Sequence, residues 1–451
     1  MFYANQKVLL IISFSWFLSR ISYALCMHKF VISLLAYLAR MIIVTHRPYI
    51  IGITGTVGKT TLSIHVAKYL SLIYGEREVR ISPYHYNGEY GLPLSIIHTR
   101  TGGSNPFRWI FVFLTALYRC ITPYPKYLVL EYGIDHPWEM EWLLSIAIPD
   151  ISILTGVMPN HLEQFGTLES YRREKLLITR DAPRCIIHES LRPYIEREAI
   201  YYGIGSMSDI DASHFHTTIK GMTANIHVHK NTYPIALPSF WAYQIENILP
   251  LYAISQILGL DPTRISQESH MFVPGSGRSS ILIWSHGETI IDGSYNGWLE
   301  SIMRGIDSIV PYLPSHKIIL ILWDMRELGT HTESSHIALA HYILQHISPL
   351  RAVDIWLVGP LMWEYVAPLL SPLFSVESML SSREVGETIA RTYPRDREDM
   401  IIYVKWSQNT IFLEEAIKPL IKKDQYSLLC RQSSEWMKKK ELFFATLIEK
   451  L

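Results

Sequence analysis

The order of hydrophobic and polar residues shows short apolar runs, each followed by a segment with helical spacing, over most of the chain. Runs of this kind lie at residues 49–54, 126–131, 150–155, 317–323, 354–358 and 400–404. Short apolar runs between amphipathic helices are typical of parallel strands that are buried on both faces. The pattern therefore predicts an α/β fold with mostly parallel sheets.

Two features divide the chain further. Residues 207–238 alternate Thr, His and Ile loosely, which predicts an antiparallel excursion, that is, a group of antiparallel strands within the mostly parallel fold. A helical stretch over residues 245–258 follows and ends at Gly259. A second α/β unit begins near Pro274. Because 451 residues exceed what one core accommodates, we predict several parts. These are a hydrophobic helical extension at 1–47, a central domain at 48–272, and a C-terminal Rossmann-like α/β domain at 273–451.

The extension is basic as well as apolar. No Asp or Glu precedes Glu76, whereas five Lys or Arg residues interrupt the first 47 positions. Its longest run without a charge, residues 8–19, is shorter than the roughly 20 residues that a membrane-spanning helix needs. A cleaved signal peptide is disfavoured, because no small-residue cleavage site follows this run.

A helix over residues 29–45 would separate the charges from part of the apolar surface. Its charges are Lys29 and Arg40, and the apolar side chains that lie away from them are Ile32, Leu35 and Leu38. This arrangement is typical of a helix that lies in an anionic membrane surface. The alternative, which the pattern leaves open, is an extension that packs on the protein itself.

Overall composition excludes several classes of function. Lys plus Arg and Asp plus Glu both number 41, so no net charge recruits nucleic acid. The four cysteines form no Cys-x-x-Cys pair, which argues against a zinc ribbon or a disulfide framework and favours the cytosol. They are Cys26, Cys120, Cys185 and Cys430.

The strongest chemical signal is the glycine-rich loop GITGTVGKTT at residues 52–61, between an apolar run and a helical segment. Such a loop wraps backbone amides around phosphate oxygens, while Lys59 neutralises phosphate charge and Thr60 offers a hydroxyl to Mg²⁺. The strict motif has glycine where Ile53 stands, so the match is to a variant of it. We predict ATP binding by Gly55, Thr56, Val57, Gly58, Lys59, Thr60 and Thr61.

A carboxylate follows the second of the apolar runs. Glu131 stands where the run at 126–131 ends, and a carboxylate that leaves a buried strand beside a phosphate loop is a suitable Mg²⁺ ligand. The alternative is a capping or surface glutamate.

The loop resembles that of the Mur ligases and of their folylpolyglutamate synthetase relatives, and the resemblance extends almost to the end of the chain. The segments NGEYGLP at 87–93 and DMRELG at 324–329, with His336 downstream, resemble the Mur ligases that add D-alanyl-D-alanine to a cell-wall precursor. The resemblance implies that Glu131 binds Mg²⁺. It also implies a second metal site with His161 and with Lys175, which is carbamylated in many members. Gly156 departs from the asparagine usual in the family.

The resemblance implies roles for further residues. Asn247 would contact the adenine, although Gln244 replaces an asparagine of the motif and Asn247 could instead cap the next helix. Arg278 would reach the ATP phosphates. Asp292 would belong to the nucleotide site, with Gly293 in place of a second aspartate. Candidate substrate-binding residues are Asn296, Asp324, Glu327, Lys405 and Ser407.

The implied activity is an ATP-dependent, ADP-forming peptide ligation. The γ-phosphate passes to a substrate carboxylate, and an amine attacks the acyl phosphate. Two Mg²⁺ ions offset the charge, and Lys59 and Arg278 stabilise the transferred group. The expected substrates are a muramoyl-peptide precursor and D-alanyl-D-alanine. We expect a cytoplasmic monomer that residues 1–45 hold at the inner face of the membrane.

Alternatives remain at the level of the substrate. Few residues precede the loop, so we expect no uridine-nucleotide domain there, and the donor could be lipid-linked. Another amide ligase, such as a folylpolyglutamate or cyanophycin-type enzyme, shares the loop but should lack DMRELG. An amidating subunit would carry a cysteine zinc ribbon. A nucleotide-binding scaffold without ligation is disfavoured by the joint presence of Glu131, His161, Lys175 and Arg278.

Four tryptophans stand where the resembled family has glycine, at Trp138, Trp241, Trp323 and Trp406. Glycine serves turns and close approaches to ligand, for which an indole is unsuited. Some bacterial lineages read the codon UGA as glycine, and another common table reads it as tryptophan. We therefore hypothesise that the natural protein has glycine at these positions.

Overall fold

The computed structural model shows two compact units. It describes residues 29–82, 88–103, 105–158, 162–205, 208–218, 221–239, 241–285, 287–295, 297, 299–326, 328–348, 352–393, 399–405 and 412–448. The first unit holds the described residues as far as Ile210 together with Ala253–Leu260, and the second holds those of Asp211–Tyr252 and Asp261–Leu451. The predicted domain boundaries after residues 47 and 272 stay predictions.

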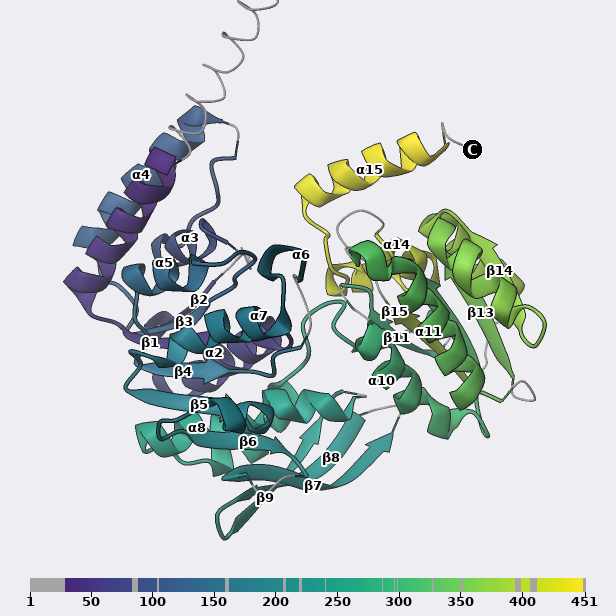
Figure 1. Cartoon of the computed structure of the whole chain (residues 1–451), viewed down its shortest axis with the longest axis horizontal. Coiled ribbons are helices and arrows are strands. Elements are labelled where there is room, and N and C mark those ends of the chain that lie inside the picture. The colour runs from purple at the N-terminus through teal and green to yellow at the C-terminus, as the bar shows by residue number, and fades with distance from the viewer. Residues whose placement is uncertain are drawn as a thin grey trace, which may run out of the picture. The chain divides into compact units, whose positions relative to one another are not determined.

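The first unit is built on a sheet of parallel strands (Figure 1). Their spatial order is β2 (Val79–Ile81), β3 (Tyr127–Glu131), β1 (Tyr49–Thr54), β4 (Ile151–Leu154), β5 (Arg184–His188) and β6 (Ile200–Ile204). Five of the six residues of β1 and all those of β3 and β4 are buried. This burial on both faces explains why the runs lack the alternation of a half-exposed strand.

Helices cover both faces of this sheet. They are the helix Lys29–His46, α2 (Lys59–Tyr74), α3 (Gly91–Ile97), α4 (Pro106–Ile121), α5 (Glu139–Ile146), α6 (Leu162–Phe165), α7 (Leu168–Leu176) and the part of α8 (Leu249–Leu258) that belongs to this unit. Helices α3, α4 and α5 share a core cluster with β1 and β3. On α2, the Tyr69 hydroxyl lies 2.8 Å from that of Ser255 on α8.

The helix Lys29–His46 confirms the helix predicted over residues 29–45, but its inner face differs from the membrane prediction. Ile32, Leu35 and Leu38 are buried, and Leu35 and Leu38 join the core cluster of the first unit. For these three side chains the alternative, packing on the protein itself, is correct. By length and composition this helix is long and apolar enough to cross a membrane, a property that core helices of soluble proteins share.

The second unit contains the antiparallel excursion and a separate sheet. Strands β7 (Ile210–Thr218), β8 (Gly221–Val228) and β9 (Asn231–Leu237) fall in the predicted segment, and β8 and β9 pair antiparallel from Met222↔Leu237 to Val228↔Asn231. The expected helical stretch at 245–258 is a 3₁₀ segment, η4 (Ala242–Asn247), followed by α8. Gly259 ends it with φ +64°.

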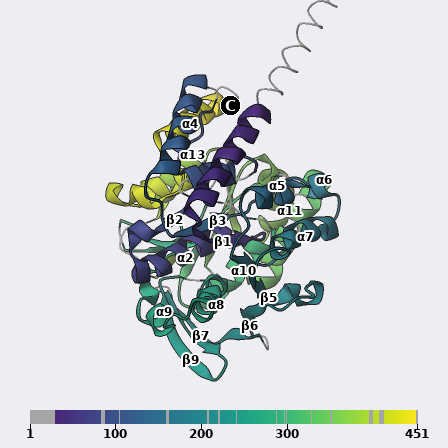
Figure 2. The ribbon, with the colours of Figure 1, turned by 90° about the vertical axis from the view of Figure 1, so that its left-hand side faces the viewer.

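The separate sheet is parallel except at one edge. Its order is β10 (Ser280–Ile283), β11 (Thr289–Gly293), β15 (Met400–Lys405), β12 (Lys317–Trp323), β13 (Val353–Val358) and β14 (Ser375–Met379). Among the described strands of this sheet, β10 alone runs antiparallel to its neighbour. The helices of this unit are α9 (Thr263–Gln267), α10 (Leu299–Ile309), α11 (Thr332–His346), α12 (Ala367–Leu370), α13 (Ser382–Thr392), α14 (Glu414–Ile417) and α15 (Ser434–Ile448). Figure 2 gives a second view of these elements.

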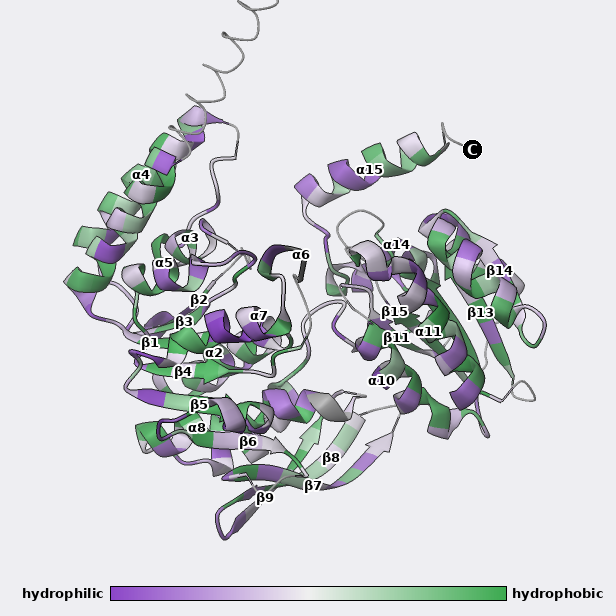
Figure 3. Cartoon of the chain, in the orientation of Figure 1, coloured by the Kyte–Doolittle hydropathy of each residue, from purple (hydrophilic) through white to green (hydrophobic). Residues whose placement is uncertain are grey.

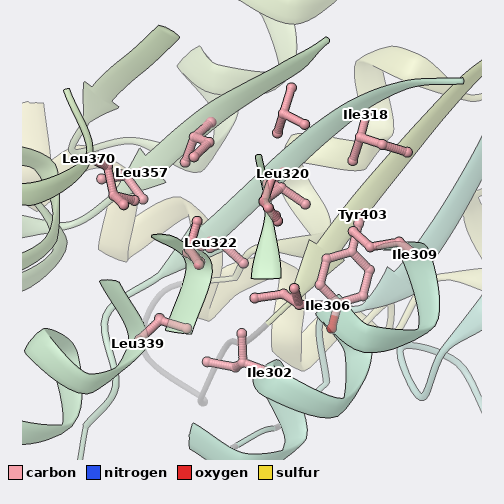
Figure 4. Packing of buried hydrophobic residues seen from close by; sticks show 14 of the residues in the cluster. Ile302, Ile306, Ile309, Ile318, Leu320, Leu322, Leu339, Leu357, Leu370 and Tyr403 are labelled. Atoms are coloured by element: carbon pink, nitrogen blue, oxygen red, sulfur yellow. The ribbon is translucent and has the colours of Figure 1, made fainter. Parts of the chain in front are cut away.

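The central strand β12 shows how the sequence positions this sheet. Ile318, Leu320 and Leu322 pack against α10 and α11, as Figure 4 shows for part of this cluster. The alternate residues of β12 point to the other face and pack with α13 and α14. On α10 the packed residues, Ile302, Ile306 and Ile309, follow helical spacing. The predicted α/β fold with mostly parallel sheets is confirmed.

Candidate active site

The glycine-rich loop connects β1 to α2, as the sequence predicts. Gly55 and Gly58 have φ angles of +138° and +83°, which L side chains rarely adopt. A Cβ on Gly55 would lie 1.8 Å from the Thr155 Oγ1 atom. The loop therefore needs glycine at residue 55 for space as well as for conformation.

The segment after β4 braces the loop. The Thr56 N–H donates to the Gly156 carbonyl at 3.0 Å, and the Thr155 hydroxyl donates to the Val57 carbonyl at 2.7 Å. Thr56 also receives a hydrogen bond at its hydroxyl from the Met158 N–H at 3.1 Å. Gly156 acts here through its backbone, so the departure from asparagine leaves the loop supported.

Lys59 begins α2 and folds back over the loop. Its ammonium donates to the Gly55 carbonyl at 2.9 Å and to the Thr56 carbonyl at 3.3 Å. The charge thus lies beside the backbone that is expected to surround the phosphates. A phosphate group placed there would meet both the ammonium and the N-terminus of α2.

Glu131 lies against the first turn of α2. One of its carboxylate oxygens accepts from the Thr60 hydroxyl at 3.0 Å, and the other accepts from the Ser63 hydroxyl at 3.0 Å. Glu131 is only 8% exposed, so the alternative of a surface glutamate is wrong. The structure brings together the hydroxyl and the carboxylate that were predicted to bind Mg²⁺, although metal binding itself stays a prediction.

Lys175 lies on α7 with 1% of its surface exposed. Burial holds the pKa of its ammonium well below the ordinary range, and the charge of Lys59 lowers this pKa further, against the opposite effect of Asp135, Glu139 and Glu174. The Nζ atom lies 4.7 Å from the centre of the Tyr171 ring. A buried amine beside another cation is therefore poised to lose its proton.

Four predicted site residues and one of the tryptophans lie outside the described residues. They are His161, Asn296, Glu327, Ser407 and Trp406. Within the described part of the chain, no three His, Cys, Asp or Glu residues gather as metal ligands.

In the second unit, a short chain of hydrogen bonds connects two predicted nucleotide-binding residues. The Asn247 amide donates to the Gln244 side-chain oxygen at 3.0 Å, and the Gln244 amide donates to the Arg278 carbonyl at 3.1 Å. Gln244 is thus the partner of Asn247 rather than a loss from the motif. The Arg278 guanidinium stacks over the Tyr295 ring at 4.2 Å.

Asp292 and Lys405 lie on adjacent strands of the second sheet, where Asp292 pairs with Val404 and Gly293 with Lys405. Burial raises the pKa of Asp292 to about 6 and lowers that of Lys405 to about 7, although the charge of Asp292 opposes the shift of Lys405. A Cβ on Gly293 would lie 2.7 Å from Lys405 Cδ. Glycine at residue 293 therefore makes room for the lysine.

Asp324 is buried at the end of β12. Its carboxylate accepts from the Met362 N–H at 2.8 Å, and burial raises its pKa to about 6. A Cβ on Gly359 would lie 2.5 Å from this carboxylate. His336 holds the following loop, because its Nε2 accepts from the Met325 N–H at 2.9 Å. The DMRELG segment is thus positioned by its own downstream histidine.

Three of the four tryptophans can be placed. Trp138 precedes α5 with φ +74° and is 77% exposed, as expected for a glycine position. Trp241 and Trp323 are buried with extended backbones, so the conformational argument for glycine fails for them. The Trp323 indole N–H is buried and has no hydrogen-bond partner within the described residues, which carries a cost. The hypothesis itself stays a prediction.

Two supporting residues were missed in the sequence. Ser63 binds Glu131 from one turn beyond Thr60, and helical spacing could have revealed it. Arg431 donates to the carbonyls of Ser294 and Tyr295 and so holds the loop after Asp292. It comes more than 130 residues later, so no local pattern could have found it.

Known proteins resemble the chain in both sequence and fold. Residues 53–254 match the Mur ligase middle domain. This match covers somewhat less than half of the chain. Among the proteins whose sequences are similar to the chain is the UDP-N-acetylmuramoyl-tripeptide–D-alanyl-D-alanine ligase of Escherichia coli, 23% identical over 64% of this chain. The corresponding ligase of Borreliella burgdorferi is 26% identical over 73% of this chain and 66% of its own length.

Solved structures agree with this assignment of the fold. The MurF ligase of Thermotoga maritima, solved with ADP, superposes with a TM-score of 0.69 at 21% identity, over 86% of this chain and 83% of its own. A folylpolyglutamate synthase of the same organism gives 0.54 at 16% identity, over 84% and 93%. The chain spans 60% of the length of the E. coli ligase.

Proposed function

We propose that this protein is an ATP-dependent, ADP-forming peptide ligase that adds D-alanyl-D-alanine to a muramoyl-tripeptide precursor of peptidoglycan. The observation that carries the proposal is the contact of Glu131 with Thr60 and Ser63 directly behind the phosphate loop. The substrates are inferred from the relatives named as D-alanyl-D-alanine ligases and from the DMRELG segment with His336. The amine and acid specificities rest on that likeness.

ATP and Mg²⁺ suit the residues of the first unit. Lys59 would offset phosphate charge, and Thr60 and Glu131 would hold an ion without a full protein cage. Mg²⁺ supplies charge neutralisation while the phosphates and the carboxylate are brought together. A second ion, with His161 and Lys175 as its site, belongs to the same proposal.

Lys175 is proposed to carry a carbamate. The neutral Nζ amine would attack the carbon of CO₂, forming an N–C bond as one C–O π bond opens, and would release a proton to solvent. The low pKa of the buried amine supports this step, because it favours the reactive neutral form. The product is an anion, which would be attracted to Lys59 instead of repelled by it and could serve a metal ion.

The remaining roles are proposed from the resemblance. Arg278 would stabilise the transferred phosphoryl group, Asn247 would contact adenine and Asp292 would belong to the nucleotide site. Asp324 and Lys405 would serve the substrates. We further propose a cytoplasmic monomer in contact with the inner face of the membrane through residues 1–45.

The test measures ADP release by the purified full chain with ATP, Mg²⁺, a UDP-linked muramoyl tripeptide and D-alanyl-D-alanine. Turnover that requires both substrates and disappears in Lys59→Ala supports the proposal. Parallel reactions use a lipid-linked tripeptide, or a folate with glutamate. Turnover with the folate alone would replace the proposed substrates, and ATP binding without turnover in any reaction would overturn the ligase assignment.

A further inference from the structure

Helix α4 presents an apolar side to solvent. Only Val112 and Ala116 of its residues are buried. The exposed fractions of its large apolar side chains are 74% for Phe107, 54% for Ile110, 73% for Phe111, 56% for Leu114, 50% for Leu117, 58% for Tyr118 and 83% for Ile121. Figure 3 shows the hydrophobic colour along much of this helix. Their spacing of three or four residues gathers them on one side.

This surface differs from scattered exposed apolar residues. Single leucines at a protein surface are ordinary, whereas a contiguous patch of aromatic and aliphatic side chains marks a binding face. Three of the seven exposed side chains are aromatic, and the exposed face runs from the first turn of α4 to its last residue, Ile121. An interaction that covers the whole length of the helix is therefore required to bury it.

The helix Lys29–His46 lies beside α4 (Figures 1 and 2). His46 Nε2 lies 2.8 Å from the Arg119 carbonyl oxygen, and Leu35 and Ala39 share the core cluster of Val112 and Ala116. The N-terminal helix also has exposed apolar side chains one heptad apart, Phe30, Tyr37 and Val44. The two helices thus form one structural element of the first unit.

The chain segments that contain these two helices carry charges of one sign. Residues 90–130 contain no Asp or Glu, and neither do residues 1–75. Exposed basic residues accompany the apolar side chains, namely Lys29, Arg40, Arg47, Arg100, Arg108 and Lys126. An apolar face on segments that carry only cationic side chains is complementary to an anionic lipid surface.

Unpartnered donors lie near the C-terminal end of α4. The Arg80 Nη1, His98 Nδ1 and Arg119 Nε atoms are buried and have no hydrogen-bond partner within the described residues. Burial lowers the pKa of Arg80 and of His98, and the nearby charge of Arg119 lowers both further. An anionic surface close to this end of α4 would offset the repulsion between the two arginines.

We propose that α4, together with the helix Lys29–His46, docks on an anionic lipid bilayer. Charge favours this occupant over two others. A second copy of the chain would bring the same cationic residues against themselves. Residues 1–28 contain Lys7 and Arg20 and no acid, so they would not neutralise the face either. This surface is independent of the ligase chemistry and adds α4 to the contact proposed for residues 1–45.

The test compares binding of full-length variants to vesicles of phosphatidylcholine with and without one third phosphatidylglycerol, by cosedimentation. We expect the parent chain to bind the anionic vesicles, and Phe111→Ser/Leu114→Ser to reduce the partition coefficient by at least about tenfold. The matched control is Trp363→Ser/Leu442→Ser, which removes side chains of 64% and 72% exposure from the second unit and should bind as the parent does.

Other outcomes assign the face differently. If the α4 variant binds vesicles as well as the parent does, the proposal is wrong. If the parent is a dimer by light scattering and does not bind vesicles, and the α4 variant is a monomer, the face binds a second copy of the chain. If the parent does not bind vesicles and the α4 variant has a lower melting temperature than the parent, the face binds residues 1–28. ADP release by the α4 variant in solution is expected to be unchanged, which separates this test from that of the ligase.

Discussion

Substitution of Gly55 by alanine tests how closely the phosphate loop is fitted to the strand behind it. The new Cβ would lie 1.8 Å from Thr155 Oγ1 in a backbone with φ +138°. The conformation costs about 1–3 kcal/mol for a side chain, and overpacking costs a further 1–3 kcal/mol or so. We expect a loss of about 2–6 kcal/mol in the free energy of unfolding of the first unit.

The matched control is Gly75→Ala, after α2. Gly75 has φ +91°, and a Cβ added there would meet no atom within 4 Å, so alanine adds backbone strain without a clash. Urea unfolding of both variants measures the difference in the free energy of unfolding of the first unit, whose unfolding is followed by hydrogen exchange of α2. Gly55→Ala should lose at least about 1 kcal/mol more than Gly75→Ala and should bind ATP weakly. Equal losses, or normal ATP affinity in Gly55→Ala, would refute the account of the loop.

Three further predictions concern residues of the two units. Lys175→Ala should lose ADP release and regain part of it with acetate or formate. Native mass spectrometry of the parent should show a labile CO₂ adduct. An active variant without rescue, together with a parent without the adduct, would contradict the proposed carbamate on Lys175. Asp324 has a pKa raised to about 6, so the folded chain binds the proton more tightly than the unfolded chain, and stability should fall as pH rises from about 4 to 6. Asp292 contributes to the same slope, so Asp324→Asn should reduce the slope without abolishing it, and an unchanged slope would exclude the Asp324 carboxyl as a source. Trp138→Gly should raise the free energy of unfolding by about 1 kcal/mol because φ is +74°, and UGG codons at the four tryptophans would rule out the recoding hypothesis.

The sequence predicts the parallel framework well because buried strands and a phosphate loop leave local patterns. Apolar side chains followed by helical segments were enough to predict the strands β1, β3, β12 and β15. Gly55, Lys59 and Thr60 are adjacent in sequence, so their joint geometry follows from one short turn.

Contacts between residues that are far apart in the sequence could not be predicted from local sequence patterns. Arg431 supports the loop at Ser294 and Tyr295 across the second unit, and Gly359 admits Asp324 by lacking a side chain. The membrane prediction is wrong for the inner face of the helix Lys29–His46, because an amphipathic helix has the same sequence pattern whether its apolar face packs on a membrane or on a protein core. Helix α4 was not noticed, because an apolar helix is ordinarily assigned to a core.

The measurement that tests the central claim most directly is mass spectrometry of the reaction product. Purified protein with ATP, Mg²⁺, UDP-linked muramoyl tripeptide and D-alanyl-D-alanine should yield the muramoyl pentapeptide and one ADP for each new amide bond, and Lys59→Ala should yield neither. ADP released without a pentapeptide product from either the UDP-linked or the lipid-linked acceptor would contradict the account.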